Sequence, residues 1–263
     1  MKIFLLKKQF LISTLIIFLL IILFLYFLFF KSYRNIIPVN INDDISLNDI
    51  TKSNKKIAYL TFDDGPTTTA TSKVLDILKS ENVKATFFVL GKHVKENPDL
   101  VKRAYQEGHY IANHGYSHNN EILYKNMESF KNEILSTDIE ISKALGIENY
   151  SSHIFRFPNG YMANMYLNQK KKALNILKEL NYLYVDWNCL NKDSEKKHSN
   201  YELLNNLKKS IKNKGTLIIL MHDTTDVNKS YEVLKDSIDY LKSQGYTFSN
   251  FYDFISRTNR EAL

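Results

Sequence analysis

The fold of this chain is decided by one short stretch, Ile57-Ala58-Tyr59-Leu60-Thr61-Phe62-Asp63-Asp64-Gly65-Pro66. Its first six residues form a run of apolar, aromatic and β-branched side chains, which predicts a strand buried on both faces. The Asp-Gly-Pro sequence that follows is favourable turn chemistry and ends the strand. Strands buried on both faces belong to parallel sheets covered by helices, so we expect an α/β protein.

The same pattern recurs along the chain, with amphipathic segments between the apolar runs. Further strands are predicted at residues 85–90, 109–112, 154–157, 182–187, 217–221 and 246–248. Helices are predicted to begin at Thr71 or Ser72, to run from Pro98 to Gly108, and to cover 129–145, 170–180, 201–211 and 231–244. Regular alternation over about 200 residues predicts one α/β domain built on a parallel sheet or barrel.

The N-terminal part differs in composition from this domain. Residues 10–30 are almost entirely apolar, and about 20 such residues cross a bilayer core as a helix. A cleavable signal peptide is the alternative, but the run is longer than a signal-peptide core and lacks a small-residue cleavage site. We therefore expect a short N-terminal segment (1–9), a transmembrane anchor (10–30), a polar linker (31–54) and one folded domain (55–263). The domain is expected outside the cell, on a single-pass membrane protein.

Composition narrows the classes of partner. The 263 residues carry a formal net charge of +7, but the basic residues are scattered along the chain. No aromatic and basic residues interleave in the manner of RNA-binding domains, so we expect no nucleic-acid partner. The single cysteine, Cys189, excludes an intrachain disulfide.

Ionisable and polar residues directly follow four of the predicted strands. These clusters are Asp63-Asp64, His114 to His118, Arg156 to Gly160, and His222-Asp223. Each has an ordinary interpretation when taken alone, as a turn, a surface histidine pair or the end of a strand. Parallel α/β folds build active sites at the carboxyl ends of their strands, so we expect the four clusters to meet.

The residue types in these clusters point to metal chemistry. Two adjacent carboxylates, Asp63 and Asp64, repel each other unless a cation or an arginine neutralises them. His114 and His118 are four residues apart, which on a helical turn directs both imidazoles toward one ion. Two histidines and one aspartate leave coordination positions open for water, as catalytic metal sites require. Arg156 lies between two phenylalanines and is expected to be buried with a carboxylate partner.

In chain order, these segments resemble the motifs of the polysaccharide deacetylases of carbohydrate esterase family 4, which share the NodB homology domain. The first and last motifs, Thr61-Phe62-Asp63-Asp64-Gly65 and Leu220-Met221-His222-Asp223, carry the resemblance most specifically. The resemblance covers about Lys55 to Phe254 and implies a distorted (β/α) barrel of about seven parallel strands. It also implies metal-dependent removal of acetyl groups from N-acetylglucosamine-type residues of a cell-wall polysaccharide, for which we expect peptidoglycan.

The resemblance assigns a role to individual residues of this sequence. In the acid–base machinery, Asp63 matches the general base, Arg156 its partner, His222 the general acid and Asp193 the carboxylate that orients it. The matching metal ligands are Asp64, His114 and His118, with Zn²⁺ expected and Co²⁺, Ni²⁺, Mn²⁺ or Fe²⁺ also compatible. Substrate contacts are expected from the backbone N–H of Asn159, from Leu220 and from Trp187.

Two positions depart from the family pattern. Gly115 stands where the family has a serine or threonine that stabilises the histidine loop, and Ser117 is a candidate to replace that hydroxyl. Ser194 stands where an aromatic side chain often forms a wall of the sugar groove. Two alternative functions remain: an esterase acting on O-acetyl xylan or another acetylated glycan, and an inactive glycan-binding module. The second predicts a replaced catalytic or metal-binding residue, and none is replaced.

Overall fold

A computed structural model describes residues 46–224 and 228–252. These residues belong to a compact unit that covers Asn40–Leu263, separate from a unit that covers Met1–Val39. The predicted anchor at 10–30 and the N-terminal part of the predicted linker lie outside the described residues. Within the ranges that the structure does describe, no helix has the length and apolar character needed to span a bilayer.

Eight strands form one sheet in which every ladder is parallel. The strands are β1 (Ile57–Asp63), β2 (Thr86–Val89), β3 (Tyr110–Asn113), β4 (Ile154–Phe155), β5 (Leu183–Tyr184), β6 (Cys189–Leu190), β7 (Leu217–His222) and β8 (Thr247–Ser249). Seven of them follow the order β5-β4-β3-β2-β1-β7-β6. The strands β5 and β6 at the two ends of this order do not pair with each other, so the barrel is open. The predicted α/β fold with about seven parallel strands is confirmed in this form.

The central strand β1 pairs with three others. Along one edge it pairs with β7 from Ala58 to Asp63. Along the other edge β8 pairs with the first residues of β1 and β2 with the last three. Because β8 and β2 pair with different parts of the same edge of β1, the sheet holds an eighth strand outside the seven-strand order. The sequence prediction missed β6, and it made β4 and β5 longer than the two residues that each contains.

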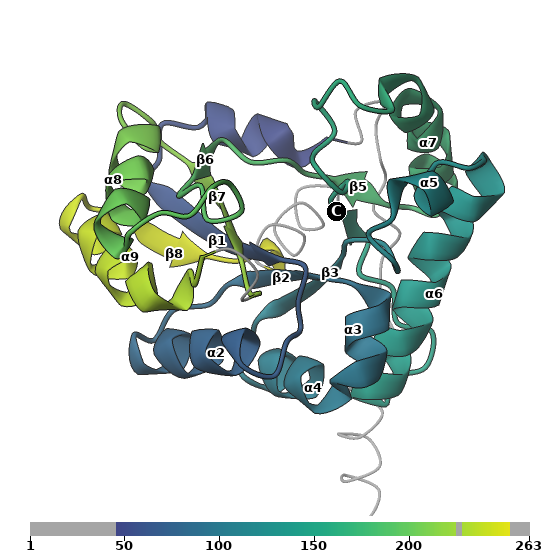
Figure 1. The fold of residues 1–263 in the computed structure, drawn as a ribbon, viewed down its shortest axis with the longest axis horizontal. Coiled ribbons are helices and arrows are strands. Elements are labelled where there is room, and N and C mark those ends of the chain that lie inside the picture. The colour runs from purple at the N-terminus through teal and green to yellow at the C-terminus, as the bar shows by residue number, and fades with distance from the viewer. Residues whose placement is uncertain (1–45, 225–227, 253–263) are drawn as a thin grey trace, which may run out of the picture. The chain divides into compact units, whose positions relative to one another are not determined.

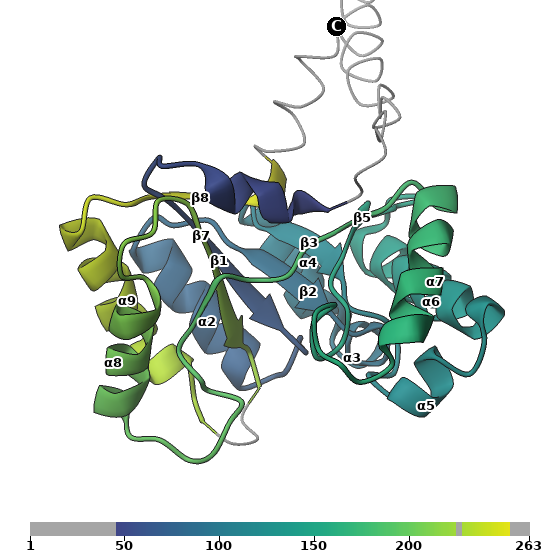
Figure 2. The ribbon, with the colours of Figure 1, turned by 90° about the horizontal axis from the view of Figure 1, so that it is seen from above.

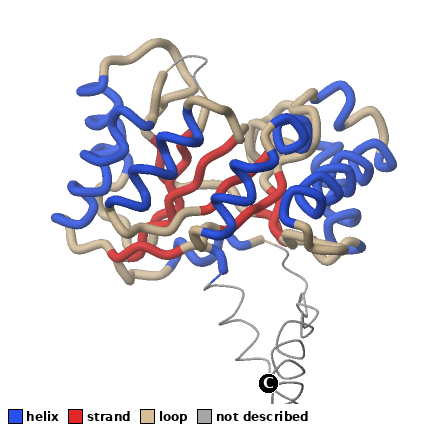
Figure 3. The backbone as a smooth tube through the Cα atoms, turned by 90° about the horizontal axis from the view of Figure 1, so that it is seen from below, coloured by secondary structure: helices blue, strands red, loops and turns tan. Residues whose placement is uncertain are grey.

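Helices surround this sheet, with α2, α8 and α9 on one side of the strands and α3, α5, α6 and α7 on the other (Figures 1 and 2). Figure 3 shows the strands lying between the helices. The helices are α2 (Ala70–Ser80), α3 (Gly91–Glu96), α4 (Pro98–Gln106), α5 (Asn120–Leu123), α6 (Met127–Leu145), α7 (Leu167–Glu179), α8 (Asn200–Ser210) and α9 (Tyr231–Ser243), and a 3₁₀ helix, η1 (Leu47–Lys52), precedes the sheet. Of these, η1, α3 and α5 were not predicted.

Local capping explains where the long helices begin and end. The Asn126 side chain accepts a hydrogen bond from the Ser129 N–H at the start of α6, and Gly146 ends that helix with φ 67°. Ser199 forms a capping box with Glu202 at the start of α8. The predicted cap of α2 at Thr71 or Ser72 is wrong, because α2 begins at Ala70 and both residues lie inside it. The Thr71 hydroxyl donates to Asp223 instead.

A buried histidine lies directly before β3. His109 is 1% exposed, and its Nδ1 accepts a hydrogen bond from the Ala85 N–H at 3.1 Å. Its ring contacts the ring of Phe87 edge-on. Burial, together with the neighbouring charge of Lys84, lowers the pKa of His109 to about 4.

The low pKa of His109 predicts that the folded protein becomes less stable in acid. In the unfolded chain His109 gains a proton near pH 6.5, whereas in the folded protein it does so only near pH 4. Its contribution to the free energy of unfolding is therefore present above pH 6.5 and is lost as the pH falls. Between pH 7 and pH 4.5, we expect this group to remove about 2.5 kcal/mol from the free energy of unfolding. His109→Asn keeps an acceptor for the Ala85 N–H but does not titrate. Urea unfolding should therefore show a shallower pH dependence for this variant, and parallel profiles would contradict the assignment.

Candidate active site

Three side chains from two loops form a potential metal site. Asp64 follows β1, and His114 and His118 follow β3, so all three come from the carboxyl ends of the two strands that flank β2. Asp64 Oδ1 lies 3.4 Å from Nε2 of His114 and 3.4 Å from Nε2 of His118. One ligand atom from each residue lies within 4.8 Å of the other two, a spacing that allows all three to hold one ion.

The backbone around these ligands is unusual. Asp64 and His118 have φ angles of 76° and 56°, which side-chain-bearing residues rarely adopt and which persist where the surroundings hold them. Residues 114–118 form a loop, with Gly115 at φ 84°, so the predicted helical turn is wrong. The loop, not a shared helical face, directs the two imidazoles toward Asp64.

Hydrogen bonds behind the site fix the orientation of its ligands. His114 Nδ1 lies 2.8 Å from the Arg156 carbonyl oxygen. A carbonyl only accepts, so Nδ1 carries the proton and the Nε2 lone pair is left available to a metal ion. His93, to which no function was assigned from the sequence, donates from Nδ1 to the Asp64 carbonyl at 2.7 Å.

The electrostatics of the three ligands suit a cation. Burial would raise the pKa of Asp64, but the neighbouring histidines outweigh it and the pKa is lowered. Burial lowers the pKa of His114, which favours the neutral imidazole that a metal needs. Asp64 Oδ1 is buried and has no hydrogen-bond donor among the described residues. A divalent ion would satisfy this oxygen, so the residues present fit the metal site that the sequence predicts.

Asp63 is held beside this site by Arg156. The Arg156 side chain is fully buried, and its Nη1 donates to Asp63 Oδ1 at 2.8 Å and to the Thr61 hydroxyl at 2.7 Å. Its guanidinium also lies over the Phe88 ring, 4.0 Å from the centroid. The second oxygen, Asp63 Oδ2, lies 3.8 Å from His114 Nε2. Arg156 therefore has the predicted carboxylate partner, and one Asp63 oxygen remains directed toward the site.

His222 and Asp193 form a second pair across the site. His222 ends β7, and its Nδ1 lies 2.7 Å from Asp193 Oδ1. The other Asp193 oxygen accepts from the His222 N–H at 2.7 Å and from the Ser230 hydroxyl. Burial would lower the pKa of His222, but the hydrogen bond and charge of Asp193 raise it to about 9. His222 Nε2 lies 4.0 Å from Asp64 Oδ2, so a protonated imidazole faces the potential metal site.

The family model described as polysaccharide deacetylase matches residues 51–185. This chain belongs to the polysaccharide deacetylase family. It is 34% identical over 201 residues to the peptidoglycan-N-acetylmuramic acid deacetylase PdaA of Bacillus subtilis, a match that covers 76% of this chain and 72% of that protein. It is 36% identical over 197 residues to a peptidoglycan-N-acetylglucosamine deacetylase of Bacillus cereus, covering 74% and 66%.

A solved structure agrees with these relatives. The catalytic domain of a peptidoglycan N-acetylglucosamine deacetylase from Eubacterium rectale superposes with a TM-score of 0.69 at 27% identity. The superposition covers 81% of this chain and 93% of that one. The family resemblance that the sequence motifs predicted is therefore confirmed.

The three predicted substrate contacts lie in the turn after β4, against that turn, and in β7. Asn159 is exposed in a turn with φ 63°, and its N–H has no acceptor within residues 46–224 and 228–252. Trp187 is half-buried and packs on this turn, since a Cβ on Gly160 would lie 2.9 Å from its ring. Leu220 is 5% exposed in β7, at the position that pairs with Thr61.

Two buried ionisable residues hold the Asn159 turn, and sequence analysis missed both. Lys170 is 1% exposed, and its Nζ donates to the Gly160 carbonyl at 2.6 Å and to the Ala163 carbonyl at 3.2 Å. The Asp186 carboxylate accepts from the Tyr161 and Met162 N–H groups. Lys170 and Asp186 lie outside the motif that contains Asn159, so the motif does not identify them.

A third missed residue, Glu133, contacts the loop in which Gly115 departs from the family pattern. Its carboxylate is buried in α6, and Oε2 accepts from the backbone N–H groups of Tyr116 and Ser117, each at 2.8 Å. Among the described residues, the hydroxyl of Ser117, the candidate to replace the one missing at Gly115, accepts only from the Asn119 N–H. The Glu133 carboxylate thus holds the histidine loop together with the Asn113 side chain, which accepts from the Gly115 N–H, and with the backbone N–H groups of Gly91 and Lys92.

Replacing Glu133 is expected to loosen the metal site without touching a ligand. Loss of a group that orients metal ligands typically costs about 10- to 100-fold in metal affinity. We expect Glu133→Ala to weaken Zn²⁺ binding by this factor, and Glu133→Gln, which keeps an acceptor oxygen, to bind within about threefold of the wild type. Competition with a chromophoric chelator measures both affinities.

Glu140→Ala is the matched control. Glu140 lies on the same helix and pairs with Lys143 at 2.9 Å, away from the histidine loop. Its replacement should leave Zn²⁺ affinity unchanged. Wild-type affinity in Glu133→Ala would show that the loop does not depend on this carboxylate.

Proposed function

We propose that this protein hydrolyses the acetamide of N-acetylglucosamine-type residues in peptidoglycan and releases acetate. The observation that carries the proposal is the convergence of Asp64, His114 and His118, with Asp63 and His222 close by. Family membership supports the reaction class. Relatives that act on the N-acetylglucosamine or N-acetylmuramic acid residues of peptidoglycan support the substrate class.

Asp64, His114 and His118 would hold the divalent ion, for which we propose Zn²⁺, with Co²⁺, Ni²⁺, Mn²⁺ or Fe²⁺ as chemically compatible alternatives. Bound there, the ion supplies Lewis acidity toward the acetyl carbonyl and toward a water molecule. The remaining work falls to the side chains and backbone groups around it.

The acid–base residues divide the proton transfers between them. Asp63 Oδ2 accepts a proton from water as the water oxygen attacks the acetyl carbon. The Asn159 N–H donates to the carbonyl oxygen as negative charge develops on it. His222 Nε2 then donates a proton to the nitrogen as the carbon–nitrogen bond breaks, leaving acetate and a free amine. Asp193 keeps His222 oriented, and Arg156 keeps Asp63 oriented, throughout.

Acetate release from defined substrates tests this function. Purified protein is incubated with N-acetylglucosamine pentamer, with intact peptidoglycan and with acetylated xylan, before and after chelation and after addition of each candidate metal. We expect the first two substrates to be deacetylated, chelation to abolish the activity, and Zn²⁺ to restore it. Preferential turnover of acetylated xylan would favour the esterase alternative. No turnover of any substrate with any metal would favour an inactive glycan-binding module.

We propose that residues 10–30 anchor the protein in the cell membrane, with residues 55–263 outside the cell as the catalytic domain. The apolar length of that run supports this, and a tether of polar residues after it would let the domain reach nearby wall polymer. Protease added to intact cells should digest the domain. Full protection of the domain until lysis would contradict this topology.

A further inference from the structure

The 3₁₀ helix η1, which precedes the central strand, is seated on the folded domain. Ser46, directly before the helix, forms a parallel bridge with Tyr184 of β5, the strand at one end of the sheet order. Leu47 is 4% exposed, so the first turn of η1 contributes to the core. After the helix, the Ser53 carbonyl accepts from the Thr216 N–H at 3.0 Å. The last part of the segment that the sequence assigns to the polar linker is therefore held against the domain at both ends.

One side chain of η1 reaches the connection that follows β5. Asn48 Oδ1 accepts a hydrogen bond from the Asp186 N–H at 2.9 Å. Asp186 lies two residues beyond the end of β5 and is 7% exposed, so its N–H has little access to water. A buried N–H that loses its acceptor is costly, and the backbone would move to recover one. Asn48 therefore fixes the position of the Asp186 backbone.

Asp186 in turn contacts two parts of the candidate active site. Its carboxylate accepts from the Tyr161 N–H at 2.9 Å and from the Met162 N–H at 3.3 Å, and so holds the turn that contains Asn159. Its carbonyl oxygen accepts from Arg156 Nη2 at 3.2 Å. Arg156 is the partner of the proposed base. A shift of Asp186 would therefore displace the proposed oxyanion donor and the partner of the base together.

We propose that Asn48 is a positioning residue of the active site and that it acts through Asp186. The inference rests on the proposed function, and it makes η1 a working part of the enzyme. Asn48 touches no reacting atom, but the residue it holds sets where the Asn159 N–H and the Arg156 side chain lie. Both of these groups serve the step in which negative charge forms on the acetyl oxygen. The contact therefore acts on the rate of that step, and not on metal or substrate affinity.

Asn48→Ala removes the acceptor and is tested in the full chain with Zn²⁺. We expect kcat to fall about fivefold on N-acetylglucosamine pentamer and on 4-nitrophenyl acetate alike, because both reactions form the same oxyanion. KM and Zn²⁺ affinity should each stay within about twofold of the wild type. Asp49→Ala is the matched control: it alters the next residue of η1, a 59% exposed carboxylate that pairs with Lys52, and should change none of these quantities. Wild-type kcat in folded Asn48→Ala, or an equal loss in Asp49→Ala, would overturn the assignment.

A double-mutant cycle tests whether Asn48 acts through Asp186. Asp186→Asn keeps the backbone N–H that Asn48 accepts from, but it replaces the carboxylate that holds the Tyr161 and Met162 N–H groups with a weaker acceptor. If the two residues act in series, the loss of kcat in the double variant should be about threefold smaller than the product of the two single losses. Single losses that simply multiply would show that the residues act independently, and would overturn the inference.

Amide hydrogen exchange separates failure of this inference from failure of the proposed function. The Tyr161 N–H is bound to the Asp186 carboxylate and does not contact Asn48. In the metal-free protein, its exchange should be about fivefold faster in Asn48→Ala than in the wild type or in Asp49→Ala. Wild-type exchange at Tyr161 in Asn48→Ala would overturn the inference whether or not the protein is active. Absence of acetate release from pentamer by the wild type with every metal would instead reject the proposed function.

Discussion

Replacing Asp63 with asparagine is expected to lower the rate of acetate release about 1000-fold on every acetylated substrate. The amide oxygen is a very weak base, so water loses its proton acceptor in the step that forms the new carbon–oxygen bond. Because that step is common to amides and esters, pentamer and 4-nitrophenyl acetate should be affected alike. The measurement is kcat for each substrate at saturating Zn²⁺.

The affinity of Asp63→Asn for Zn²⁺ is the control measurement. Asp63 is not one of the three converging ligands, so Zn²⁺ affinity should remain within about fivefold of the wild type. Asp63→Asn leaves the buried Arg156 charge without its carboxylate, and removal of one partner from such a pair costs about 3 kcal/mol of unfolding free energy. Asp76→Asn, which alters a 66% exposed carboxylate paired with Arg103, should change neither quantity. Retained activity in a folded, metal-binding Asp63→Asn protein would exclude Asp63 as the base.

Replacing His222 with asparagine is expected to discriminate between substrates by their leaving groups. An amine departs only after it has gained a proton, whereas 4-nitrophenolate is stable as an anion. We therefore expect kcat for the pentamer to fall about 1000-fold and kcat for the aryl acetate to fall less than about tenfold. The asparagine amide can still donate to Asp193, so the loop that contains this carboxylate should keep its position.

The ratio of the two losses is the decisive measurement for His222. Equal losses on both substrates would mean that His222 stabilises a charge common to both reactions and is not a proton donor to the leaving group. Unchanged activity on the pentamer would remove His222 from the mechanism. Asp193→Asn provides an independent check, because it should reproduce the same preference for the aryl acetate to a smaller degree.

Local sequence patterns predict much of the fold. The apolar run at Ile57 predicts the central strand, and Leu217 to Met221 predicts the strand that pairs with it over six residue pairs. Long amphipathic segments likewise predict α4, α6, α8 and α9 near their observed bounds. These elements are long enough for periodicity to show. The strand β6 and the helix α3 are too short to carry such a signal, and their backbone is fixed by neighbouring strands and loops.

The candidate site likewise contains residues that the sequence predicts and residues that it does not. Asp63, Asp64, His114 and His118 lie in compact motifs, and Arg156, Asp193 and His222 follow from the family pattern. The supporting residues Glu133, Lys170 and Asp186 could not be predicted, because their partners are backbone groups. Backbone N–H and C=O groups do not depend on residue type. The sequence therefore does not show which of them a buried side chain will contact.

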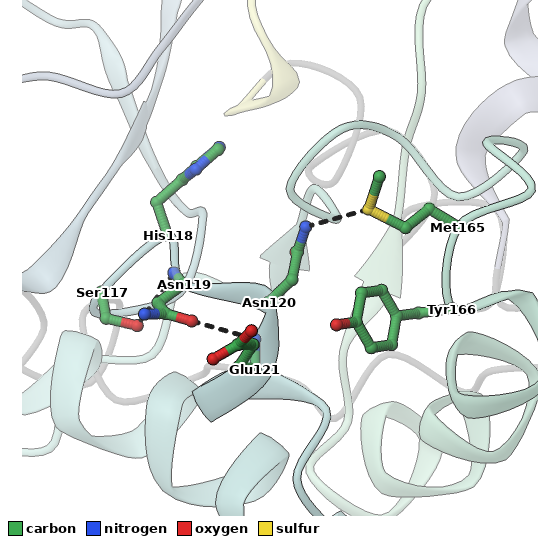
Figure 4. A pocket seen from close by; sticks show the side chains of 7 residues that line it. All are labelled: Ser117, His118, Asn119, Asn120, Glu121, Met165 and Tyr166. Carbon is green, nitrogen blue, oxygen red and sulfur yellow. Dashed lines mark hydrogen bonds between the residues drawn. The ribbon is translucent and has the colours of Figure 1, made fainter.

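The sequence by itself determined the fold class, the family and the candidate site residues, because each of these depends on residue type and spacing along the chain. Only the tertiary structure decided which Asp63 oxygen faces the site, which histidine nitrogen is available to a metal, and how the Gly115 loop is held. It also revealed a hollow that His118 lines together with Met165 and Tyr166 (Figure 4). These features depend on contacts between segments that are distant in the chain, and their geometry exists only once the sheet has brought the loops together.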